Sequence, residues 1–389
     1  MYHGFGKFIR GKGFSILFYL VSVLLMFYLT VKIGSVAEYV FSVDIYSAVF
    51  VVLAVLMFYM LCYFSSKKAE KRAKNLYEVC GVVLCVLLNL TMCFLVFDFL
   101  NIFVPFEKAG WCLIPTAAGV LLSAYGFFHA RHLTVKKYQI QLGEKKLNKR
   151  LVLLSDIHTG SFVNEKHLEK IIEKVNELNA DLIFIAGDTF DVKAFECCNL
   201  PKLEEIFRRL RSKEGVYASL GNHDPLSSEK NVREFFEKSG ICLLTDKCAE
   251  TQDFYIIGRE DVTSCPDRKS LAEILPKKRG RKPEILLEHN PGGIEEAIEN
   301  KVTLVLCGHT HKGQFFPATF FTRLAYGKKD FYGYAKREET QSIVSAGTGY
   351  FQMPMRIGSN SDRSIKETAS LGSCVMLLNV AVFYFVFSF

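Results

Sequence analysis

Five segments in the second half of the chain share one pattern, in which an apolar run typical of a β-strand ends at side chains that can bind a metal ion. The runs begin at Leu151, Asp181, Gly215, Glu284 and Val302. The side chains that follow them are Asp156 and His158, Asp188, Asn222, His289, and His309 and His311. In layered α/β folds, ligand sites are assembled at the carboxyl ends of the strands. The pattern therefore predicts an α/β domain in which these strand ends meet.

These seven side chains combine carboxylates, imidazoles and one amide, without a thiolate. This donor set suits two divalent ions such as Mn, Fe, Zn or Mg rather than copper or an iron–sulfur cluster. Two ions ~3.5–4 Å apart lower the pKa of bound water and so supply a nucleophile for hydrolysis at neutral pH. Asp188 is the candidate for the bridging carboxylate, because Gly187 lets the backbone come close to the ions.

His223 directly follows Asn222 and precedes Asp224. Its ring can lie over the ions while the Asp224 carboxylate fixes its tautomer or holds it protonated. We therefore predict that His223 is the general acid, with Asp224 in support. Asp191 is either a further support of the site or a loop cap. The histidines to which we assign no role in the site are His3, His129, His132 and His167.

Four charge-free apolar stretches dominate the first third of the chain. They are Phe14–Val31, Ile45–Ser66, Val79–Phe97 and Ala109–Phe128, of 18, 22, 19 and 20 residues. Each is close to the ~20 residues that an α-helix needs to cross a bilayer core. The alternative is a buried helix of a soluble core, but such helices rarely run so long without a charge. The sequence therefore predicts a transmembrane region of four helices within residues 1–130.

Basic residues are concentrated on one side of these predicted helices. They lie before the first helix, between Lys67 and Lys74, and between Arg131 and Lys137. The charged residues of the two opposite loops are only Lys32, Glu38 and Asp44 in one, and Glu107 and Lys108 in the other. The positive-inside rule then places the N-terminus and the segment after the fourth helix in the cytoplasm. We expect a multi-pass protein of the cell inner (cytoplasmic) membrane, with its catalytic domain facing the cytoplasm.

The cysteines and the net charge agree with this location. Twelve cysteines without paired metal-type spacing favour a reducing compartment. The net charge of +8 follows from the topology and from Lys and Arg near the bilayer, where anionic lipids attract them. The sequence contains no recognisable nucleic-acid-binding module, so we expect the membrane lipid bilayer as a partner and no nucleic acid.

Residues 131–373 alternate strand-like and helix-like segments. Tyr138–Leu142 has the alternation of a leading strand, and Glu165–Leu178 has apolar residues at helical spacing. Phe254–Gly258 and Ser342–Ala346 are typical of further strands. This order favours two stacked sheets flanked by helices over a single open sheet.

Three segments fit this order less well. Pro276–Pro283 is a basic loop that either faces the lipid or is a solvated turn. Phe315–Tyr334 holds eight aromatic residues and reads as an irregular segment that either faces the lipid or packs in the core. Residues 374–389 form an apolar C-terminal tail, which we interpret as a closing strand, with a membrane-associated segment as the alternative.

Taken in order, the motifs Asp156-x-His158, Gly187-Asp188, Gly221-Asn222-His223-Asp224, His289 and Gly308-His309-Thr310-His311 resemble those of the calcineurin-like metallophosphoesterases. The resemblance extends to Pro354-x-Arg356, as in a bacterial subset with N-terminal transmembrane helices. It implies a four-layer α/β/β/α sandwich with two metal ions. It also implies that Asp156, His158 and His311 hold one ion, that Asn222, His289 and His309 hold the other, that Asp188 bridges them, and that His223 is an acid backed by Asp224. Lys312 departs from the pattern, since that subset often has glycine there.

The leading hypothesis is a membrane-anchored, metal-dependent phosphohydrolase, a phosphodiesterase or pyrophosphatase. We expect its substrate to be a membrane lipid phosphoester, and the resemblance implies a UDP-diacylglucosamine-type precursor as one example. The alternatives are a phosphodiesterase of soluble nucleotides, a non-catalytic membrane scaffold that keeps the fold, and a transporter. The intact ligand set argues against the scaffold, and the lack of a charge in the middle of any predicted span argues against transport.

Overall fold

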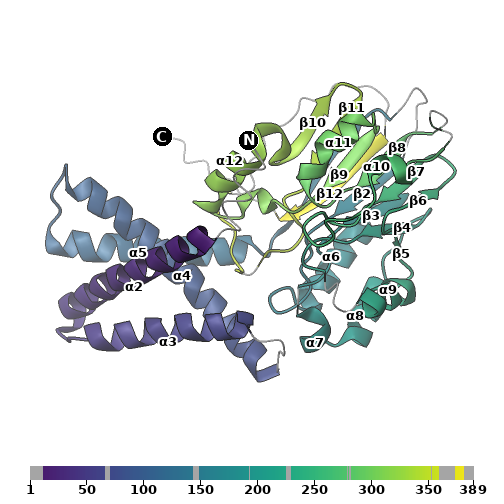
Figure 1. Cartoon of the computed structure of the whole chain (residues 1–389). Coiled ribbons are helices and arrows are strands. Elements are labelled where there is room, and N and C mark those ends of the chain that lie inside the picture. Colours follow the sequence, from purple (N-terminus) through teal and green to yellow (C-terminus); the bar gives the residue numbers. More distant parts are fainter. Residues whose placement is uncertain are drawn as a thin grey trace. The chain divides into compact units, whose positions relative to one another are not determined.

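The computed structural model describes residues 12–65, 71–142, 149–191, 193–224, 229–277, 279, 282–351, 353–358 and 373–380 (Figure 1). Its contacts divide the chain into two compact units. One, which we call the helical unit, comprises Met1–Phe128 with Met353–Met355. The other, which we call the sandwich unit, comprises His129–Gln352 with Arg356–Phe389.

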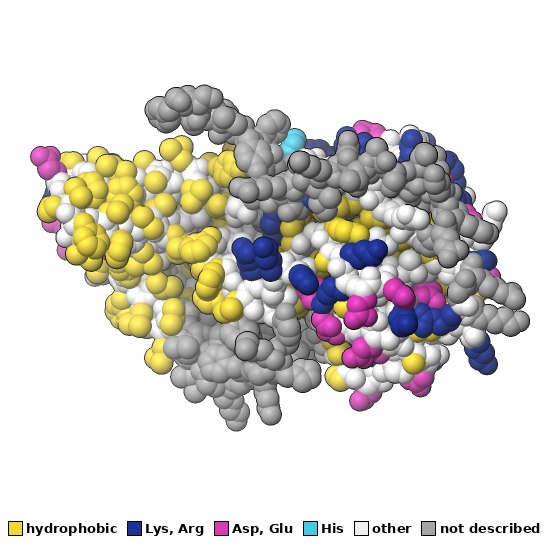
Figure 2. All heavy atoms as spheres, turned by 90° about the horizontal axis from the view of Figure 1, so that it is seen from above, with side chains coloured by type: hydrophobic (Ala, Val, Ile, Leu, Met, Phe, Trp, Pro, Cys, Tyr) yellow, Lys and Arg dark blue, Asp and Glu magenta, His cyan; other side chains and the backbone are white. Residues whose placement is uncertain are grey.

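The helical unit is a bundle of apolar helices. They are α2 (Lys12–Phe41), α3 (Tyr46–Ser65), α4 (Lys71–Asn101) and α5 (Lys108–His129). Leu29, Leu53, Leu90 and Phe94 form a buried cluster among them. Many of the outward-facing large side chains are also apolar, which gives this unit the broad hydrophobic surface of Figure 2. A bundle that is apolar both inside and outside is typical of a hydrocarbon environment.

Three of these helices are long and apolar enough to cross a membrane. The spans are Leu20–Phe41 in α2, Lys74–Asn101 in α4 and Lys108–His129 in α5. In α3, the apolar stretch over the residues whose side chains are described is Tyr46–Tyr59, which is shorter than the ~20 residues that a span requires. The prediction of four spanning helices is therefore not exact.

Lys32 lies inside α2, although the sequence suggested a loop. Its Nζ atom is 2.6 Å from Oδ1 of Asp98 in α4 and 3.7 Å from the ring centre of Trp111 in α5. The Tyr28 hydroxyl donates to the other Asp98 oxygen at 2.7 Å. A charge among apolar helices is tolerated when it is paired and hydrogen-bonded. This pairing explains how α2 continues past its apolar run to Phe41.

The sandwich unit contains two six-stranded sheets (Figure 1). The first has the order β1 (Leu133–Ile140), β12 (Ser373–Val380), β2 (Arg150–Leu154), β3 (Leu182–Ala186), β4 (Val216–Ser219) and β5 (Cys242–Leu243). The second has the order β10 (Gly333–Arg337), β11 (Thr340–Val344), β9 (Leu304–Cys307), β8 (Glu284–Leu287), β7 (Tyr255–Gly258) and β6 (Lys247–Glu250). Strands β2, β3 and β4 are parallel neighbours, as are β7, β8 and β9, so their carboxyl ends share an edge within each sheet.

Alternation along the strands builds the layers. Leu151 and Leu153 of β2 pack with Ile285 of β8 and Leu304 of β9 in one core between the sheets. Residues that alternate with these along the strands of the second sheet, such as Leu286, point to the other face and pack with helices there. These are α10 (Leu271–Ile274) and α11 (Ile294–Glu299), while α6 (Glu165–Glu177), α7 (Ala194–Cys197), α8 (Leu200–Phe207) and α9 (Glu229–Lys238) lie on the side of the first sheet (Figure 1). The predicted four-layer α/β/β/α sandwich is confirmed.

Some elements differ from their predicted form. Strand β1 begins at Leu133, earlier than expected. The aromatic segment is not irregular, because most of it forms α12 (Ala318–Asp330), which Gly327 interrupts with a φ of 72°. Part of the C-terminal tail forms β12, which pairs antiparallel with β1 and parallel with β2. Residues 381–389, and residues 278, 280 and 281 of the basic loop, lie outside the described part of the chain.

A substitution of Glu288 tests how the second sheet is held to its outer helices. Its carboxylate is fully buried, with one oxygen 3.3 Å from Arg259 Nη1 and the other 2.8 Å from Arg268 Nη1. We expect Glu288→Ala to lower the free energy of unfolding by about 3–5 kcal/mol, because it leaves the buried Arg268 guanidinium without its carboxylate partner and leaves Arg259 with Glu296 alone. The exposed Arg209, which pairs with Glu205, is the control, and Arg209→Ala is expected to cost about 1 kcal/mol or less. Equal shifts of the unfolding temperature of the full chain in detergent would contradict this account.

Candidate metal centre

The sequence-predicted ligands converge at the carboxyl ends of strands from both sheets. Asp156 and His158 follow β2, Asp188 follows β3, and Asn222 follows β4 in the first sheet, while His289 follows β8, and His309 and His311 follow β9 in the second. Five of the seven are buried at the junction of the sheets, and Asn222 and His309 are half-buried. Since parallel strands end at a common edge, the topology alone brings these segments together.

One group of possible ligand atoms comes from Asp156, His158 and His311. These atoms lie within 4.8 Å of one another. The Nε2 atoms of His158 and His311 are 3.0 Å apart, and Nε2 of His311 is 3.4 Å from Oδ1 of Asp156. Two imidazole nitrogens and a carboxylate oxygen therefore face one small volume, as a bound cation requires.

A second group comes from Asp156, Asp188 and His289. Oδ2 of Asp188 is 3.2 Å from Nε2 of His289 and 3.6 Å from Nε2 of His158. The Asp188 carboxylate thus lies between the two groups, which fits a bridging position.

Asn222 and His309 lie beside the second group. Nδ1 of His309 is 2.8 Å from Oδ1 of Asn222 and 3.3 Å from Nε2 of His289. The structure therefore brings together all seven ligands that the sequence singled out.

Two histidine rings are oriented by bonds on the side away from the site. Nδ1 of His158 is 3.1 Å from Oδ1 of Asp191, and Nδ1 of His289 is 2.8 Å from the Ala186 carbonyl oxygen. When Nδ1 donates to an oxygen, Nε2 carries a lone pair that can bind a metal ion. Asp191, for which the sequence left two roles open, supports the site through His158.

The chemistry of Asp156 fits a cation. Its Oδ1 atom accepts from the backbone N–H of His309 at 2.9 Å. Its Oδ2 atom is buried and has no hydrogen-bond partner within the described residues. Because a buried, unpaired carboxylate oxygen is costly, divalent ions held by these side chains would stabilise the arrangement.

The backbone is strained at five of the seven ligands. Left-handed φ values occur at Asp156 (48°), His158 (50°), Asp188 (51°), His309 (71°) and His311 (48°). Such conformations cost of order 1–3 kcal/mol each at non-glycine residues and persist where the surrounding structure imposes them. Here they turn alternate side chains of a strand end toward the same point.

Two glycines allow the segments to come this close. A Cβ atom on Gly187, whose φ is 76°, would lie 2.5 Å from Nδ1 of His289. A Cβ atom on Gly308 would lie 2.3 Å from Oδ2 of Asp156. Any larger residue would therefore push a ligand out of place.

The pKa values of the two buried carboxylates, Asp156 and Asp188, are shifted in opposite directions. Burial disfavours the charge of Asp188, but the neighbouring imidazoles of His289 and His158 outweigh burial and hold its pKa well below its usual range. Burial raises the pKa of Asp156, and the charge of Asp188 adds to this, whereas His289 opposes it. Despite its burial, the pKa of His289 lies well above its usual value because of Asp188. The negative charge of Asp188 is thus balanced by the neighbouring imidazoles, a role that a bound cation can also fill.

His223 lies at the edge of this cluster. Its backbone N–H donates to Oδ1 of Asp188 at 2.7 Å, and its ring centre is 5.4 Å from that of His158. Burial and the repulsion of His158 lower its pKa, although Asp188 opposes them.

The Asp224 side chain makes its hydrogen bonds to the backbone. Its two oxygens accept from the N–H groups of Phe190 at 2.9 Å and Gly221 at 2.8 Å. Burial and Asp188 raise its pKa to about 7. These contacts fix the loop that carries Asn222 and His223.

Phe351 is a site residue that sequence reasoning missed. Its ring centre lies 4.6 Å from that of His223, 5.3 Å from that of His158 and 6.0 Å from that of His311. The side chain of Gln314 holds its backbone, since Oε1 accepts from the Phe351 N–H at 2.8 Å and Nε2 donates to its carbonyl at 3.1 Å. No spacing rule marks one aromatic residue among many, so the sequence carried no signal for it.

In the sequence, Arg356 is only the last residue of the Pro354-x-Arg356 motif. Its contacts explain why an arginine is useful at this position. Nη2 of the fully buried guanidinium donates to the carbonyls of Ala346 at 2.6 Å and Gly349 at 2.7 Å. The N–H of Gly349 in turn donates to the Asp156 carbonyl at 2.9 Å. Arg356 therefore holds a loop against the backbone of a predicted ligand.

Comparisons with known proteins agree with this geometry. Residues 149–313 match the family model of the calcineurin-like phosphoesterases. A transmembrane protein with metallophosphoesterase domain from Danio rerio is 32% identical over 279 residues, which cover 66% of this chain and 62% of that protein. A metallophosphoesterase from Aquifex aeolicus is 31% identical over 260 residues, which cover 62% of this chain and 94% of that protein.

A more distant relative has a named activity. The phosphodiesterase YaeI of Escherichia coli is 28% identical over 174 residues, which cover 42% of this chain and 61% of that protein. The chain thus spans less than two thirds of the length of the Danio rerio and Escherichia coli proteins. The matched residues contain the strand ends and ligands described above, and the chain belongs to the calcineurin-like metallophosphoesterases, a family of metal-dependent hydrolases.

Proposed function

We propose that this protein is a membrane-anchored phosphohydrolase that uses two divalent metal ions to cleave a phosphodiester or pyrophosphate bond in a membrane lipid. The observation that carries the proposal is the convergence of seven ligand side chains around Asp188, beside His223. The relation to the phosphodiesterase YaeI supports the reaction class.

The geometry supports two sets of ligands, one for each ion. Asp156, His158 and His311 would hold one ion, Asn222, His289 and His309 would hold the other, and Asp188 lies between the two groups. When bound, two such ions activate water at neutral pH and stabilise charge on the phosphoryl oxygens. Mn, Fe, Zn and Mg all suit these donors.

His223 donates a proton to the leaving oxygen. Its ring is half-buried against Phe351, which restricts its orientation, and its backbone is fixed by Asp188. Its lowered pKa makes the imidazolium a stronger acid than an exposed histidine. Asp224 keeps the loop in place through Gly221 and Phe190.

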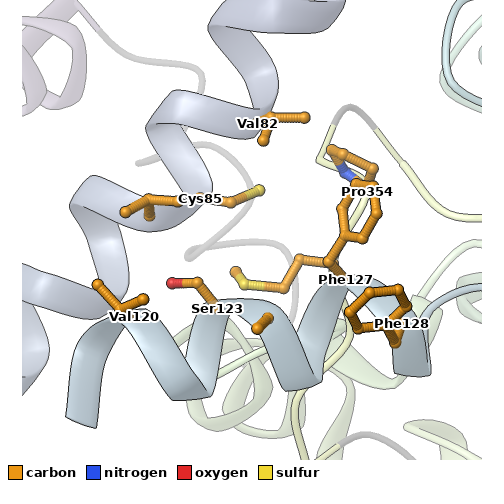
Figure 3. Close-up of a pocket in the computed structure, with 10 residues that line it drawn as sticks. Val82, Cys85, Val120, Ser123, Phe127, Phe128 and Pro354 are labelled. Carbon is orange, nitrogen blue, oxygen red and sulfur yellow. The ribbon is translucent and has the colours of Figure 1, made fainter. Parts of the chain in front are cut away.

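A lipid substrate is supported by the helical unit. Three of its helices are suited to span a membrane, so the enzyme works where lipids are concentrated. The unit also contains an open pocket of about 330 Å³ between α4 and α5 (Figure 3). Val82, Cys85, Val120, Phe127, Phe128 and Pro354 are among its lining residues, and this apolar lining suits a hydrocarbon chain.

We place the sandwich unit on the cytoplasmic side of the inner membrane. The basic residues between Arg131 and Lys137, which follow α5, support this orientation by the positive-inside rule.

Two substitutions separate metal binding from proton transfer. Asp188→Asn is expected to lose both bound metal and hydrolysis of bis-p-nitrophenyl phosphate, because it removes the shared negative charge. His223→Ala is expected to keep its metal content while kcat falls by roughly 10²- to 10⁴-fold, the usual effect of a missing general acid. Metal analysis and initial rates of the full chain in detergent give both quantities.

Exposed residues supply the matched controls for this pair. Asp267→Asn and His132→Ala change the same side-chain types away from the cluster and should alter neither quantity. Normal activity of Asp188→Asn, or the loss of metal from His223→Ala, would remove the proposed roles.

Substrate class is tested with the full chain in vesicles made from a membrane lipid extract. We expect a phosphorylated lipid species to disappear, as followed by mass spectrometry, and to persist with Asp188→Asn. Soluble dinucleotides added to the same vesicles should be hydrolysed more slowly than the lipid, because they are not concentrated at the bilayer. Faster turnover of the nucleotides than of any lipid would favour a soluble substrate instead.

Topology is tested with a reporter enzyme that is active only outside the cytoplasm. If α3, an apolar helix of 20 residues, crosses the bilayer with α2, α4 and α5, fusions after Asp44 and Glu107 are active and a fusion after Lys146 is inactive. An active fusion after Lys146 would reverse the orientation. Opposite results at Asp44 and Glu107 would mean that α3 does not cross the bilayer.

A further inference from the structure

The exposed apolar side chains of the sandwich unit are concentrated in one segment. Phe316, Phe320, Phe321 and Leu324 are 52–63% exposed. Elsewhere among the described residues of this unit, the most exposed large apolar side chain is Val262, at 41%. A water-soluble surface rarely groups aromatic residues in this way, and such patches mark sites of interaction.

The helix α12 gathers these residues on one face. Phe320 and Leu324 are four residues apart, and Phe321 lies next to Phe320, so the three fall within about 100° of the helix circumference. The rings of Phe320 and Phe321 meet edge to face with centres 5.5 Å apart. Phe316 extends the face just before the helix begins at Ala318.

The opposite side of α12 is fastened to the metal-binding loop after β9. A Cβ atom on Gly313 would lie 2.2 Å from Cα of Thr319, so the two backbones are in close contact. The ring of Tyr326 lies 5.9 Å from that of His309, and the Thr310 hydroxyl donates to the Phe331 carbonyl at 2.8 Å. The exposed face therefore has a fixed position relative to the predicted ligands.

Exposed cations accompany the apolar face, one within the helix and two just after its interruption at Gly327. Arg323, Lys328 and Lys329 are exposed, and within the described residues none of the three forms an ion pair. A helix with aromatic residues on one face and Lys or Arg at its borders is suited to lie in the headgroup region of an anionic bilayer. This charge pattern, in a chain whose other unit has helices suited to span a membrane, favours a lipid surface over a protein partner.

We propose that α12 is an interfacial helix, which inserts Phe316, Phe320, Phe321 and Leu324 into the bilayer and so holds the metal centre at the depth of lipid headgroups. The proposal rests on the membrane location proposed above, and it assigns to the sandwich unit a lipid contact of its own. It gives a reason for an aromatic helix directly after the two histidines of β9.

The test places a single fluorophore on this face. The chain has one tryptophan, Trp111, so Phe320→Trp in a Trp111→Phe background gives emission from position 320 alone. The full chain is reconstituted in vesicles of phosphatidylethanolamine and phosphatidylglycerol, with or without bromine on the acyl chains near the headgroups. We expect a blue-shifted emission that loses most of its intensity in the brominated vesicles.

Val262→Trp in the same background is the matched control, because Val262 is exposed on the same unit but outside the patch. Its emission should keep its intensity. Equal intensities in brominated and plain vesicles at position 320 would overturn the proposal. A blue shift without quenching that disappears on dilution of the protein in lipid would overturn it in favour of a second copy of the chain.

A second variant relates the patch to substrate. Phe320→Ser with Phe321→Ser and Leu324→Ser should keep the metal content and the hydrolysis of bis-p-nitrophenyl phosphate, but lose most of the turnover of lipid in vesicles. Unchanged lipid turnover would contradict the proposed role. The fluorescence result does not depend on hydrolysis, so a failure of the proposed function remains distinguishable from a failure of this inference.

Discussion

The structure depends on placing two buried carboxylates, Asp156 and Asp188, a short distance apart. Their charges repel each other and lack water, so they require compensating positive charge nearby. Imidazoles from both sheets surround them, and the backbone of five ligands accepts a left-handed conformation to reach the same volume. The two-sheet core, the glycines at the strand ends and the loop held by Arg356 all serve to keep this unfavourable grouping intact. Metal ions would turn the same grouping into a stable one.

The meeting of the seven candidate ligands could be predicted from the sequence because strand ends are recognisable. An apolar run such as Leu151–Leu154 fixes where a strand stops, and parallel topology then decides which side chains meet. The four-layer arrangement follows from the same alternation. By contrast, the contacts of Phe351 and Arg356 depend on a loop that leaves β11 and returns to β2, and no local pattern encodes that path.

The ends of the helices in the helical unit are harder to predict from the sequence, for a physical reason. Hydropathy marks where a charge first appears, but it does not reveal whether that charge is paired. Lys32 ends an apolar run in the sequence, yet within the bundle Asp98 neutralises its charge and the Trp111 ring lies against it, so α2 continues. In the same way, the aromatic composition of α12 could not distinguish core packing from exposure, because that depends on which side of the helix Gly313 and His309 occupy.

The position of β12 has a consequence for how the protein is made. Strand β1, which follows directly after α5 in the chain, is joined to its sheet through β12, and β12 also pairs with β2. During synthesis on the ribosome, β1 cannot join its sheet until residues 373–380 have been translated. Long-range pairing of this kind is slow and leaves an apolar edge open in the meantime. Nascent chains that stall before β12 would therefore lack the strand that joins β1 to β2.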